Sequence, residues 1–169
     1  GGVFLASGIA RDRGLDRVVS FDMGGTTAKL CLVEDGEARS ARSFEVARIY
    51  RFRKGSGLPL RIPVIEMVEI GAGGGSIARV DDLGRIAVGP DSAGSEPGPV
   101  CYGRGGERPT VTDADLVLGR IDPVLFSGGR IGLDAAGASA ALGREIGARL
   151  ALSPELAAFG VDEMVDNNM

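Results

Sequence analysis

Short apolar runs separated by glycine, aspartate and proline dominate the first half of the chain, a pattern typical of β-strands and their turns. A small apolar helix over residues 3–10, closing near Gly14, precedes the first strand. Asp35-Gly36 lies between two runs and is the best hairpin signal of the chain. The predicted strands cover residues 17–21 (a buried strand), 28–34, 37–46, 61–70, 76–80 and 85–88.

Helix signals gather in the last third of the chain. Thr112–Asp115 resembles the start of a capping box, and Asp134 can cap a long Ala-rich helix that reaches about Leu150. Ser153-Pro154 is a strong helix start, with Ser as N-cap and Pro in the first helical position, and Gly160 ends or breaks that segment. Strands first and helices second predict a mixed α/β fold.

The composition narrows the classes of function. The 169 residues are 44% hydrophobic, enough for the core of one globular domain. A net charge of −4 leaves no basic surplus for nucleic acid, and no apolar run reaches the roughly 18 residues of a membrane-spanning helix. The chain has no histidine, which removes Ser-His-Asp, Cys-His and HExxH chemistry. Two cysteines without CxxC spacing form no zinc site alone, and a cytoplasmic location fits them best.

Both ends look like cuts through a longer chain. The first residue is Gly1 rather than Met, and no basic region of a signal peptide follows it. The last residues carry no stop signal for their helix. We therefore expect residues 1–169 to be a single-domain fragment of a longer protein.

The sharpest candidate for chemistry is the turn Asp22-Met23-Gly24-Gly25-Thr26-Thr27, which joins two predicted strands. Its two glycines let the backbone turn tightly with amides free to face an anion, and two hydroxyls follow them. The Asp at its start could hold a metal ion or the waters of that ion. This arrangement suits a phosphate with Mg²⁺. An ordinary Gly-Gly hairpin with an Asp at the turn is an equal alternative.

A second glycine segment, Gly71-Ala72-Gly73-Gly74-Gly75-Ser76, fits no standard phosphate motif. It lacks the last glycine of GxGxxG and leads into a strand, whereas a dinucleotide fingerprint opens a helix. Neither lysine follows a glycine, so GxxxxGK[ST] is absent as well. Three successive glycines permit the close approach of a neighbour. We favour a ligand as that neighbour, with a sharp turn against another backbone as the alternative.

A third segment, residues 89–108, is a long loop rich in Gly, Pro and Ser, which is usually functional or disordered. Cys101 in this loop is a possible nucleophile, but such a cysteine is more often a packed apolar side chain, and no histidine is present to activate it. Asp113 follows the loop, where an interaction with the helix dipole is the simpler role and a site role the alternative. Residues 48–60 form a basic loop or ragged hairpin.

Three segments, in this order, are similar to the hydantoinase A family. They are residues 22–29 (DMGGTTAK), 70–78 (IGAGGGSIA) and 88–119 (VGPDSAGSEPGPVCYGRGGERPTVTDADLVLG). With the flanking strands and residues 128–134, the resemblance covers nearly the whole chain, and the last two segments are long and unusual. The family includes N-methylhydantoinase subunits, 5-oxoprolinase, and subunits of acetone and acetophenone carboxylases.

The resemblance implies part of the nucleotide-binding half of an actin-like ATPase (ribonuclease H-like) fold, with a mixed sheet and helices concentrated toward the C-terminus. It implies ATP and Mg²⁺ as cofactors. Many relatives carry Asp where this chain has Lys29, so this lysine either faces the phosphates or points outward without a specific role. The resemblance places Asp22 as catalytic and metal-binding residue, and Gly24, Gly25, Thr26, Thr27, Gly73, Gly74 and Gly75 as cofactor-binding residues.

In the general chemistry of the family, ATP phosphorylates an amide or carbonyl oxygen and so opens the substrate to attack. The resemblance implies an ATP-dependent hydrolase of a small cyclic amide such as a hydantoin or 5-oxoproline, with a hydantoinase B-type partner subunit or domain. An ATP-dependent carboxylase subunit and a non-catalytic nucleotide-binding or assembly module are the alternatives. We expect the fragment alone to be inactive, because half a phosphate clamp leaves the γ-phosphate unheld.

Overall fold

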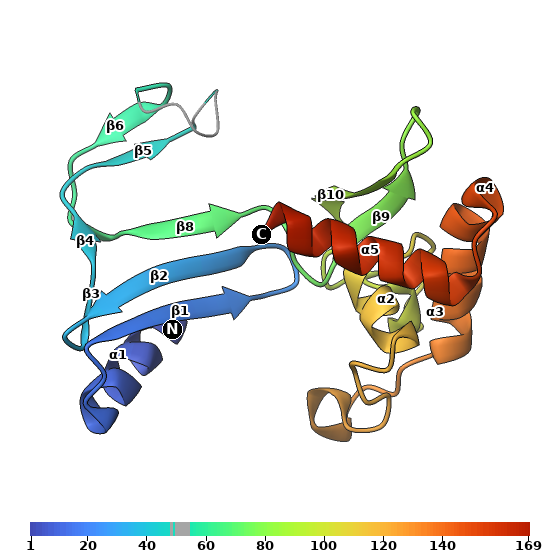
Figure 1. Ribbon diagram of the computed structural model, residues 1–169, viewed down its shortest axis with the longest axis horizontal. Coiled ribbons are helices and arrows are strands. Elements are labelled where there is room, and N and C mark those ends of the chain that lie inside the picture. The colour runs from blue at the N-terminus through green and yellow to red at the C-terminus, as the bar shows by residue number, and fades with distance from the viewer. Residues whose placement is uncertain (48, 50–54) are drawn as a thin grey trace. The chain divides into compact units, whose positions relative to one another are not determined.

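The computed structural model describes residues 1–47, 49 and 55–169 and contains two compact units (Figure 1). The first unit comprises residues 1–22 and 29–69, and the second comprises residues 23–28 and 70–169. The single domain expected from the sequence stays a prediction. Most of the basic part of the 48–60 stretch, namely Arg48, Arg51, Arg53 and Lys54, lies outside the described residues.

The first unit combines one helix with a small sheet. Helix α1 (Gly2–Arg13) ends at Gly14, which has a left-handed φ of 62°, as predicted. Strands β1 (Arg17–Met23), β2 (Ala28–Glu34) and β3 (Glu37–Ala38) are neighbours in this order, and β8 (Met67–Ile70) also pairs with β2. Figure 1 shows β1 and β8 running opposite to β2. Where the register is known within the described ranges, strand pairs are antiparallel, so the expected mixed sheet does not appear among them.

The hairpin predicted at Asp35-Gly36 is confirmed. The two residues have φ angles of 51° and 74°, and Glu34 pairs with Glu37 across the turn. Positive φ at both central positions defines the two-residue turn whose twist matches that of antiparallel strands. A Cβ at Gly36 would also collide with the side chain of Arg11, so glycine here lets α1 pack against the turn.

Two strand predictions in this unit were wrong in detail. β1 was expected to be buried, but Val19 and Phe21 are 61% and 52% exposed. An apolar run shows that a strand is able to be buried, whereas its actual burial depends on the elements that pack against it.

The strands expected over 37–46 and 61–70 are each interrupted, because their parts pair with different partners. The pieces are β3, β4 (Ser40–Ala41), β5 (Phe44–Val46), β7 (Val64–Ile65) and β8, with β4 pairing β7 and β5 pairing β6 (Leu58–Leu60).

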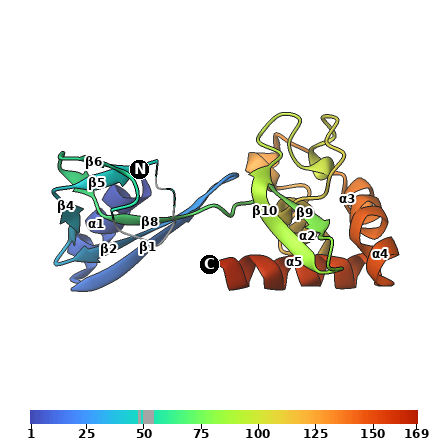
Figure 2. The same cartoon turned by 90° about the horizontal axis from the view of Figure 1, so that it is seen from above.

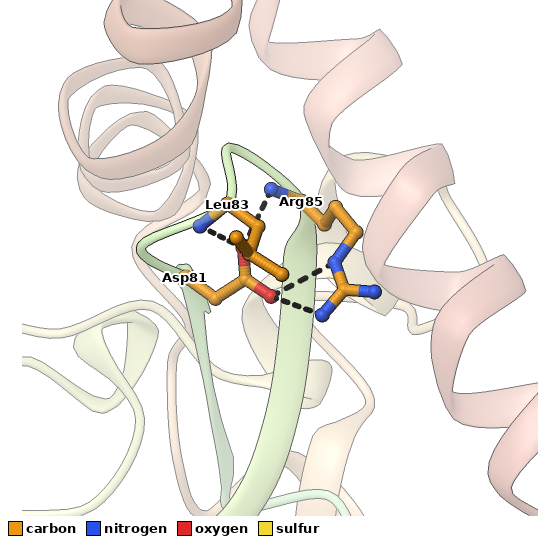
Figure 3. A network of polar contacts seen from close by, with 3 residues as sticks. All are labelled: Asp81, Leu83 and Arg85. Carbon is orange, nitrogen blue, oxygen red and sulfur yellow. Dashed lines mark hydrogen bonds and ion pairs between the residues drawn. The ribbon is translucent and has the colours of Figure 1, made fainter.

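The second unit opens with the antiparallel pair β9 (Ser76–Val80) and β10 (Ile86–Ser92). β10 extends four residues beyond the predicted end of its strand, into the segment expected to be loop. The side chain of Asp81 stabilises the turn of this hairpin (Figure 3). One carboxylate oxygen accepts hydrogen bonds from the amides of Leu83 (2.9 Å) and Arg85 (2.8 Å). The other carboxylate oxygen binds the Arg85 guanidinium. These bonds, the Arg85 amide foremost, lower the pKa of Asp81.

Helices make up the rest of this unit. α2 (Val111–Val117) starts from Thr110, which forms a capping box with Asp113, so the predicted start at Thr112 lies two residues too late. α3 (Ala135–Leu142) begins at the predicted cap Asp134 and continues through a π-helical turn (Gly143–Gly147) into α4 (Ala148–Leu150). Two short 3-10 turns, η1 (Val100–Tyr102) and η2 (Phe126–Gly129), lie in the loops.

α5 (Pro154–Asn168) begins at the predicted cap Ser153 but runs straight through Gly160, where a break was expected. A Cβ at Gly160 would collide with Cδ1 of Ile86 in β10. The glycine therefore serves close packing of α5 on the hairpin rather than termination. Figures 1 and 2 show α5 lying beside α2 and β10, and the largest fully buried side chains of the unit include Ile77, Leu142, Ile146 and Val161.

Candidate functional site

The turn between β1 and β2 has an open outer side. The amide of Gly24 donates to the carbonyl oxygen of Thr27 (2.9 Å), which closes the turn. Gly24, Gly25 and Thr26 are exposed and Thr27 is half-buried. In the part of the chain that the structure describes, the hydroxyls of both threonines are without a hydrogen-bond partner. The turn therefore presents polar groups that an incoming ligand can use.

The second glycine segment lies directly against this turn. The amide of Gly74 donates to the carbonyl oxygen of Gly24 (3.0 Å), and the amide of Gly75 donates to that of Gly25 (2.6 Å). Two successive carbonyl groups of the turn are thus fixed in direction by a neighbouring loop. The two donor–acceptor distances are within or slightly below the usual range of about 2.7–3.2 Å for amide–carbonyl hydrogen bonds.

Fixing these carbonyl groups also fixes the amides that follow them. The peptide bonds at Gly24-Gly25 and Gly25-Thr26 are trans, so each N–H points away from the preceding C=O. The amides of Gly25 and Thr26 therefore face away from the glycine loop. Within the described residues neither amide has an acceptor. Two adjacent free N–H groups on one side of a turn can both donate to an anion.

The glycines of the supporting loop are needed for close contact with backbone. A Cβ at Gly73 would lie 2.6 Å from the carbonyl oxygen of Gly24, and one at Gly75 would lie 2.8 Å from that of Gly25. Their amides are occupied as well, since Gly73 donates to the buried hydroxyl of Ser76 (2.9 Å). The close neighbour expected for these glycines is thus another backbone, which was the alternative to a ligand. In this geometry Gly73, Gly74 and Gly75 support the site and offer it no amide.

The glycines of the turn itself have no such structural need. A Cβ at Gly25 would meet nothing within 4 Å, and at Gly24 the nearest atom, the Thr27 carbonyl oxygen, would be 3.7 Å away. Neither residue has a positive φ. The fold would accept a side chain at both positions. A bound ligand that approaches the backbone closely would give a physical reason for glycine at these two positions.

Asp22 is the penultimate residue of β1 and has an exposed side chain. Its Oδ2 lies 3.1 Å from the position that a Cβ of Gly2 would take, at the first turn of α1. No group of three or more His, Cys, Asp or Glu side chains capable of holding a metal occurs in the described residues. Mg²⁺ at phosphate sites often takes only one or two carboxylates, with waters and phosphate oxygens completing its shell. Asp22 directly precedes the turn in the sequence, and a single carboxylate of this kind is a ligand that Mg²⁺ accepts at phosphate sites.

Lys29 and Glu69 form an ion pair on neighbouring strands of the first unit, with Nζ 3.5 Å from Oε1. Both side chains are about half exposed. The ion pair gives Lys29 a partner at the surface of the sheet. Of the two orientations that the sequence analysis considered for this lysine, the contact agrees with the outward one. Neither residue enters the proposed phosphate contacts.

The nucleophile hypothesis for Cys101 was wrong. The residue is fully buried and packs with Leu116 and Ala138, and burial, aided by the charge of Asp113, raises the pKa of its thiol far above the ordinary value. A thiol that is buried and protonated is a poor nucleophile. The alternative, a packed small apolar side chain, is the role that the structure gives it.

Asp113 holds the loop before α2 in place. Its buried carboxylate accepts from the amides of Cys101 (2.7 Å), Thr110 (2.8 Å) and Val100 (3.2 Å), and from the Thr110 hydroxyl (2.9 Å). These four hydrogen bonds give the Asp113 carboxylate a structural role. That role is more extensive than the interaction with the helix dipole expected from the sequence. Farther along the loop, the guanidinium of Arg104 lies 5.9 Å from the ring centre of Tyr102.

Two hydroxyl residues support the glycine loop; sequence reasoning named both within larger segments but did not predict these contacts. Ser76 accepts the amide of Gly73, and the Thr112 hydroxyl donates to the carbonyl oxygen of Gly74 (2.8 Å). A serine directly after the glycines was a visible signal for the first. Thr112 is 38 residues from its partner, and no local pattern indicates that contact.

Known proteins resemble this chain along its whole length. Residues 1–169 match the sequence model of a family described as hydantoinase/oxoprolinase. The alpha subunit of caprolactamase from Pseudomonas jessenii is 41% identical over 161 residues, which are 95% of this chain and 22% of that protein. The crystal structure of ATP-dependent caprolactamase from the same organism has a TM-score of 0.76 at 38% identity, covering 98% of this chain and 23% of that one. A nucleotide-free structure of acetone carboxylase, from work on ATP-dependent acetone carboxylation, has a TM-score of 0.84 at 33% identity, covering 99% of this chain and 22% of that one. The chain thus spans less than a quarter of the length of these relatives.

Proposed function

This chain belongs to the hydantoinase/oxoprolinase family, and from that premise we propose that it carries a phosphate-binding element of an ATP-dependent enzyme. The observation that carries the proposal is the pair of free, outward-facing amides at Gly25 and Thr26, held in direction by the hydrogen bonds behind them. We propose further that residues 1–169 are a part of a longer chain, in the nucleotide-binding half of an actin-like ATPase fold.

Each residue of the turn has a role in this proposal. The amides of Gly25 and Thr26 and the hydroxyls of Thr26 and Thr27 donate to phosphate oxygens of ATP. Asp22 holds Mg²⁺ or its waters, and the ion supplies positive charge that neutralises the phosphates. Gly24 and Gly25 leave room for the phosphate beside the backbone. Gly73, Gly74 and Gly75 keep a place in the site as the loop that orients the turn.

We propose that the complete enzyme is an ATP-dependent hydrolase of a small cyclic amide. The similarity to an ATP-dependent caprolactamase supports this reaction class. The γ-phosphoryl group of ATP passes to the amide oxygen, and ADP leaves. Water then adds to the activated carbon, and the ring C–N bond breaks as the amine takes up a proton, which leaves an acyl phosphate. A second water hydrolyses the acyl phosphate to the carboxylate and free phosphate.

A carboxylase subunit is the second candidate, supported by the similarity to acetone carboxylase. Both reactions can use the same phosphate-binding turn, since they differ in the nucleophile that attacks the activated carbon. Turnover of a lactam or hydantoin with ATP would favour the hydrolase. ATP-dependent incorporation of labelled bicarbonate into a ketone would favour the carboxylase. A non-catalytic nucleotide-binding module would do neither while still binding ATP.

Partner and location follow the same reasoning. The caprolactamase relative is an alpha subunit, which supports a partner subunit or domain of the hydantoinase B type. Cys31 and Cys101 are free and buried, which agrees with the cytoplasmic location that we propose. None of the helices in the described residues is long and apolar enough to cross a membrane.

Calorimetric titration of Mg-ATP into the complete enzyme tests the proposal. We expect Asp22→Ala and Gly25→Ala each to weaken binding about tenfold or more. The melting temperature should be unchanged, because the Asp22 side chain is exposed and a Cβ at Gly25 would meet nothing within 4 Å. Asp82→Ala is the matched control, an exposed aspartate at the tip of the β9–β10 hairpin. Wild-type affinity in both site variants would make the turn structural and end the proposal.

The 169-residue chain by itself should not turn over ATP. It supplies one phosphate-binding turn, and positioning of the phosphoryl group between several elements accounts for most of phosphoryl-transfer catalysis. A coupled assay of phosphate release from the purified chain measures this. Steady hydrolysis at a rate proportional to the concentration of the chain would contradict the expectation.

A further inference from the structure

Thr112 binds one carbonyl group twice. Its backbone amide and its side-chain hydroxyl each donate to the carbonyl oxygen of Gly74 at 2.8 Å. The residue is the second of α2 and is 6% exposed. The amides of a first helical turn lack partners within the helix. Here one such amide, together with the adjacent hydroxyl, is used to hold the glycine loop.

The bond to Gly74 continues directly to the phosphate turn. The Gly74 carbonyl group shares a trans peptide plane with the Gly75 amide, which donates to the carbonyl oxygen of Gly25 and so sets the direction of the Thr26 amide. The Gly74 amide likewise donates to the carbonyl oxygen of Gly24. Thr112 is thus two hydrogen bonds away from an amide of the proposed phosphate site. A Cβ at Gly74 would lie 2.7 Å from the Thr112 hydroxyl oxygen, which shows how closely the loop and the helix approach.

The start of α2 is itself firmly held. Thr110 and Asp113 form the capping box, and Asp113 also binds the loop before the helix. The amide of Ala78 in β9 donates to the carbonyl oxygen of Pro109 (2.8 Å). Thr112 therefore connects the glycine loop to a fixed element rather than to a second loop.

The Thr112 hydroxyl has no part in starting the helix. Capping is done by Thr110, whose side chain accepts from the Asp113 amide. A hydroxyl that served only helix stability would be expected at that position. The contact of Thr112 points outward from the helix, to the glycine loop.

We propose that Thr112 is a positioning residue for nucleotide binding. Its hydroxyl fixes Gly74, and Gly74 fixes the carbonyl of Gly24, so that the amides of the turn stay directed at the phosphates. Thr112 touches no reacting atom in this scheme. The proposal rests on the proposed ATP site and adds to it a residue that is 86 positions from Thr26 in the sequence.

The test compares three variants of the complete enzyme. Thr112→Val keeps the shape and removes the hydroxyl, and Thr112→Ser restores the hydroxyl. Thr110→Val is the matched control, because it is the same substitution in the same helical turn and weakens the cap without touching Gly74. The measurements are Mg-ATP affinity by calorimetry, melting temperature, and hydrogen exchange of the Gly74 and Gly75 amides without nucleotide.

We expect Thr112→Val to raise the Kd for Mg-ATP about three- to tenfold and to speed exchange of the two amides, in line with the loss of one hydrogen bond. Thr112→Ser should return both values to those of the wild type. Thr110→Val should lower the melting temperature more than it lowers ATP affinity.

Two outcomes would overturn the proposal. One is unchanged exchange of the Gly74 and Gly75 amides in Thr112→Val, and the other is an equal loss of ATP affinity in Thr110→Val, which would assign the effect to general helix stability. Failure of the ATP site itself is separate, because it shows as wild-type ATP affinity in Asp22→Ala and Gly25→Ala. The exchange measurement still tests whether the Thr112 hydroxyl holds the glycine loop, since it uses no nucleotide.

Discussion

The amide of Gly75 donates a 2.6 Å hydrogen bond to the carbonyl oxygen of Gly25, across 50 residues of sequence. This bond and the parallel one from Gly74 to Gly24 set the outward direction of two amides in the β1–β2 turn. The capacity of the turn to bind an anion therefore depends on a second loop that offers it no ligand group. The predictions below test that arrangement and the packing around it.

Gly75→Ala should weaken both the fold and ATP binding. The new Cβ would lie 2.8 Å from the Gly25 carbonyl oxygen and 3.0 Å from the Ser92 hydroxyl oxygen, so the two loops must separate. Overpacking of this kind costs about 1–3 kcal/mol of the free energy of unfolding. Gly71→Ala is the control, since its Cβ would meet nothing within 4 Å. Denaturant unfolding and Mg-ATP titration of both variants check this, and equal behaviour of the two would refute it.

Gly160→Ala should stabilise the protein less than the same substitution in an open part of a helix. Replacing glycine by alanine inside an unhindered helix gains about 1 kcal/mol of the free energy of unfolding. At Gly160 the added methyl group collides with Cδ1 of Ile86, the end of a half-buried side chain, and moving that side chain to another rotamer offsets part of the gain. Gly8→Ala in α1, where the space is open, should give the full gain. Thermal unfolding should show a smaller rise in melting temperature for Gly160→Ala than for Gly8→Ala, and an equal rise for both would contradict the packing argument.

The contribution of Asp81 to stability should disappear in acid. Hydrogen bonds from Arg85 and Leu83 hold the pKa of this carboxyl below its ordinary value in the folded state (Figure 3). A lowered pKa means that the stabilisation is present above the unfolded-state pKa, near 3.9, and is lost as pH falls through the folded-state pKa. The difference in stability between wild type and Asp81→Asn should therefore shrink below about pH 4.

Unfolding followed from neutral to acid pH measures the effect of Asp81. Asp82→Asn is the control, because Asp82 is exposed and neighbours the same turn. A difference between wild type and Asp81→Asn that stays constant down to the lowest pH would show that the charge of Asp81 is not involved.

Cys101 should be inert in the folded protein. Burial raises the pKa of its thiol, so the thiolate that reacts with alkylating reagents is scarce, and the side chain is closed to solvent. Labelling with iodoacetamide, followed by mass spectrometry, should modify Cys101 only after denaturation. Cys101→Ala should retain turnover in the complete enzyme. Rapid labelling of the native protein, or loss of turnover at unchanged stability, would reopen a chemical role.

Several elements follow from the residues alone because their causes are local. The hairpin at Asp35-Gly36 needs positive φ at two successive positions, and these residues tolerate it. Helices begin at Asp134 and Ser153 because each side chain accepts a hydrogen bond from an amide within its own first turn. A short motif contains all the atoms that such contacts require.

Where the predictions were wrong, the cause lies far away in sequence. Gly160 was expected to break a helix, but its partner is Ile86 in another element. For the glycine loop the sequence left a ligand and another backbone both open, and the neighbour in the structure is the backbone of Gly24 and Gly25. A run of glycines indicates that another group approaches the backbone closely. It does not indicate whether that group belongs to a ligand or to another part of the chain.

Composition and motifs were thus sufficient to show that these 169 residues supply no histidine for catalysis, to single out Asp22–Thr27 as a phosphate candidate, and to indicate the family. They could not give the direction in which the amides of Gly25 and Thr26 point. That direction depends on trans peptide geometry combined with hydrogen bonds from Gly74 and Gly75, and on Thr112 behind them. These hydrogen bonds join residues that only folding brings together. A hydrogen bond forms only at a short donor–acceptor distance and a favourable angle, and one segment of sequence does not determine either for a partner far along the chain.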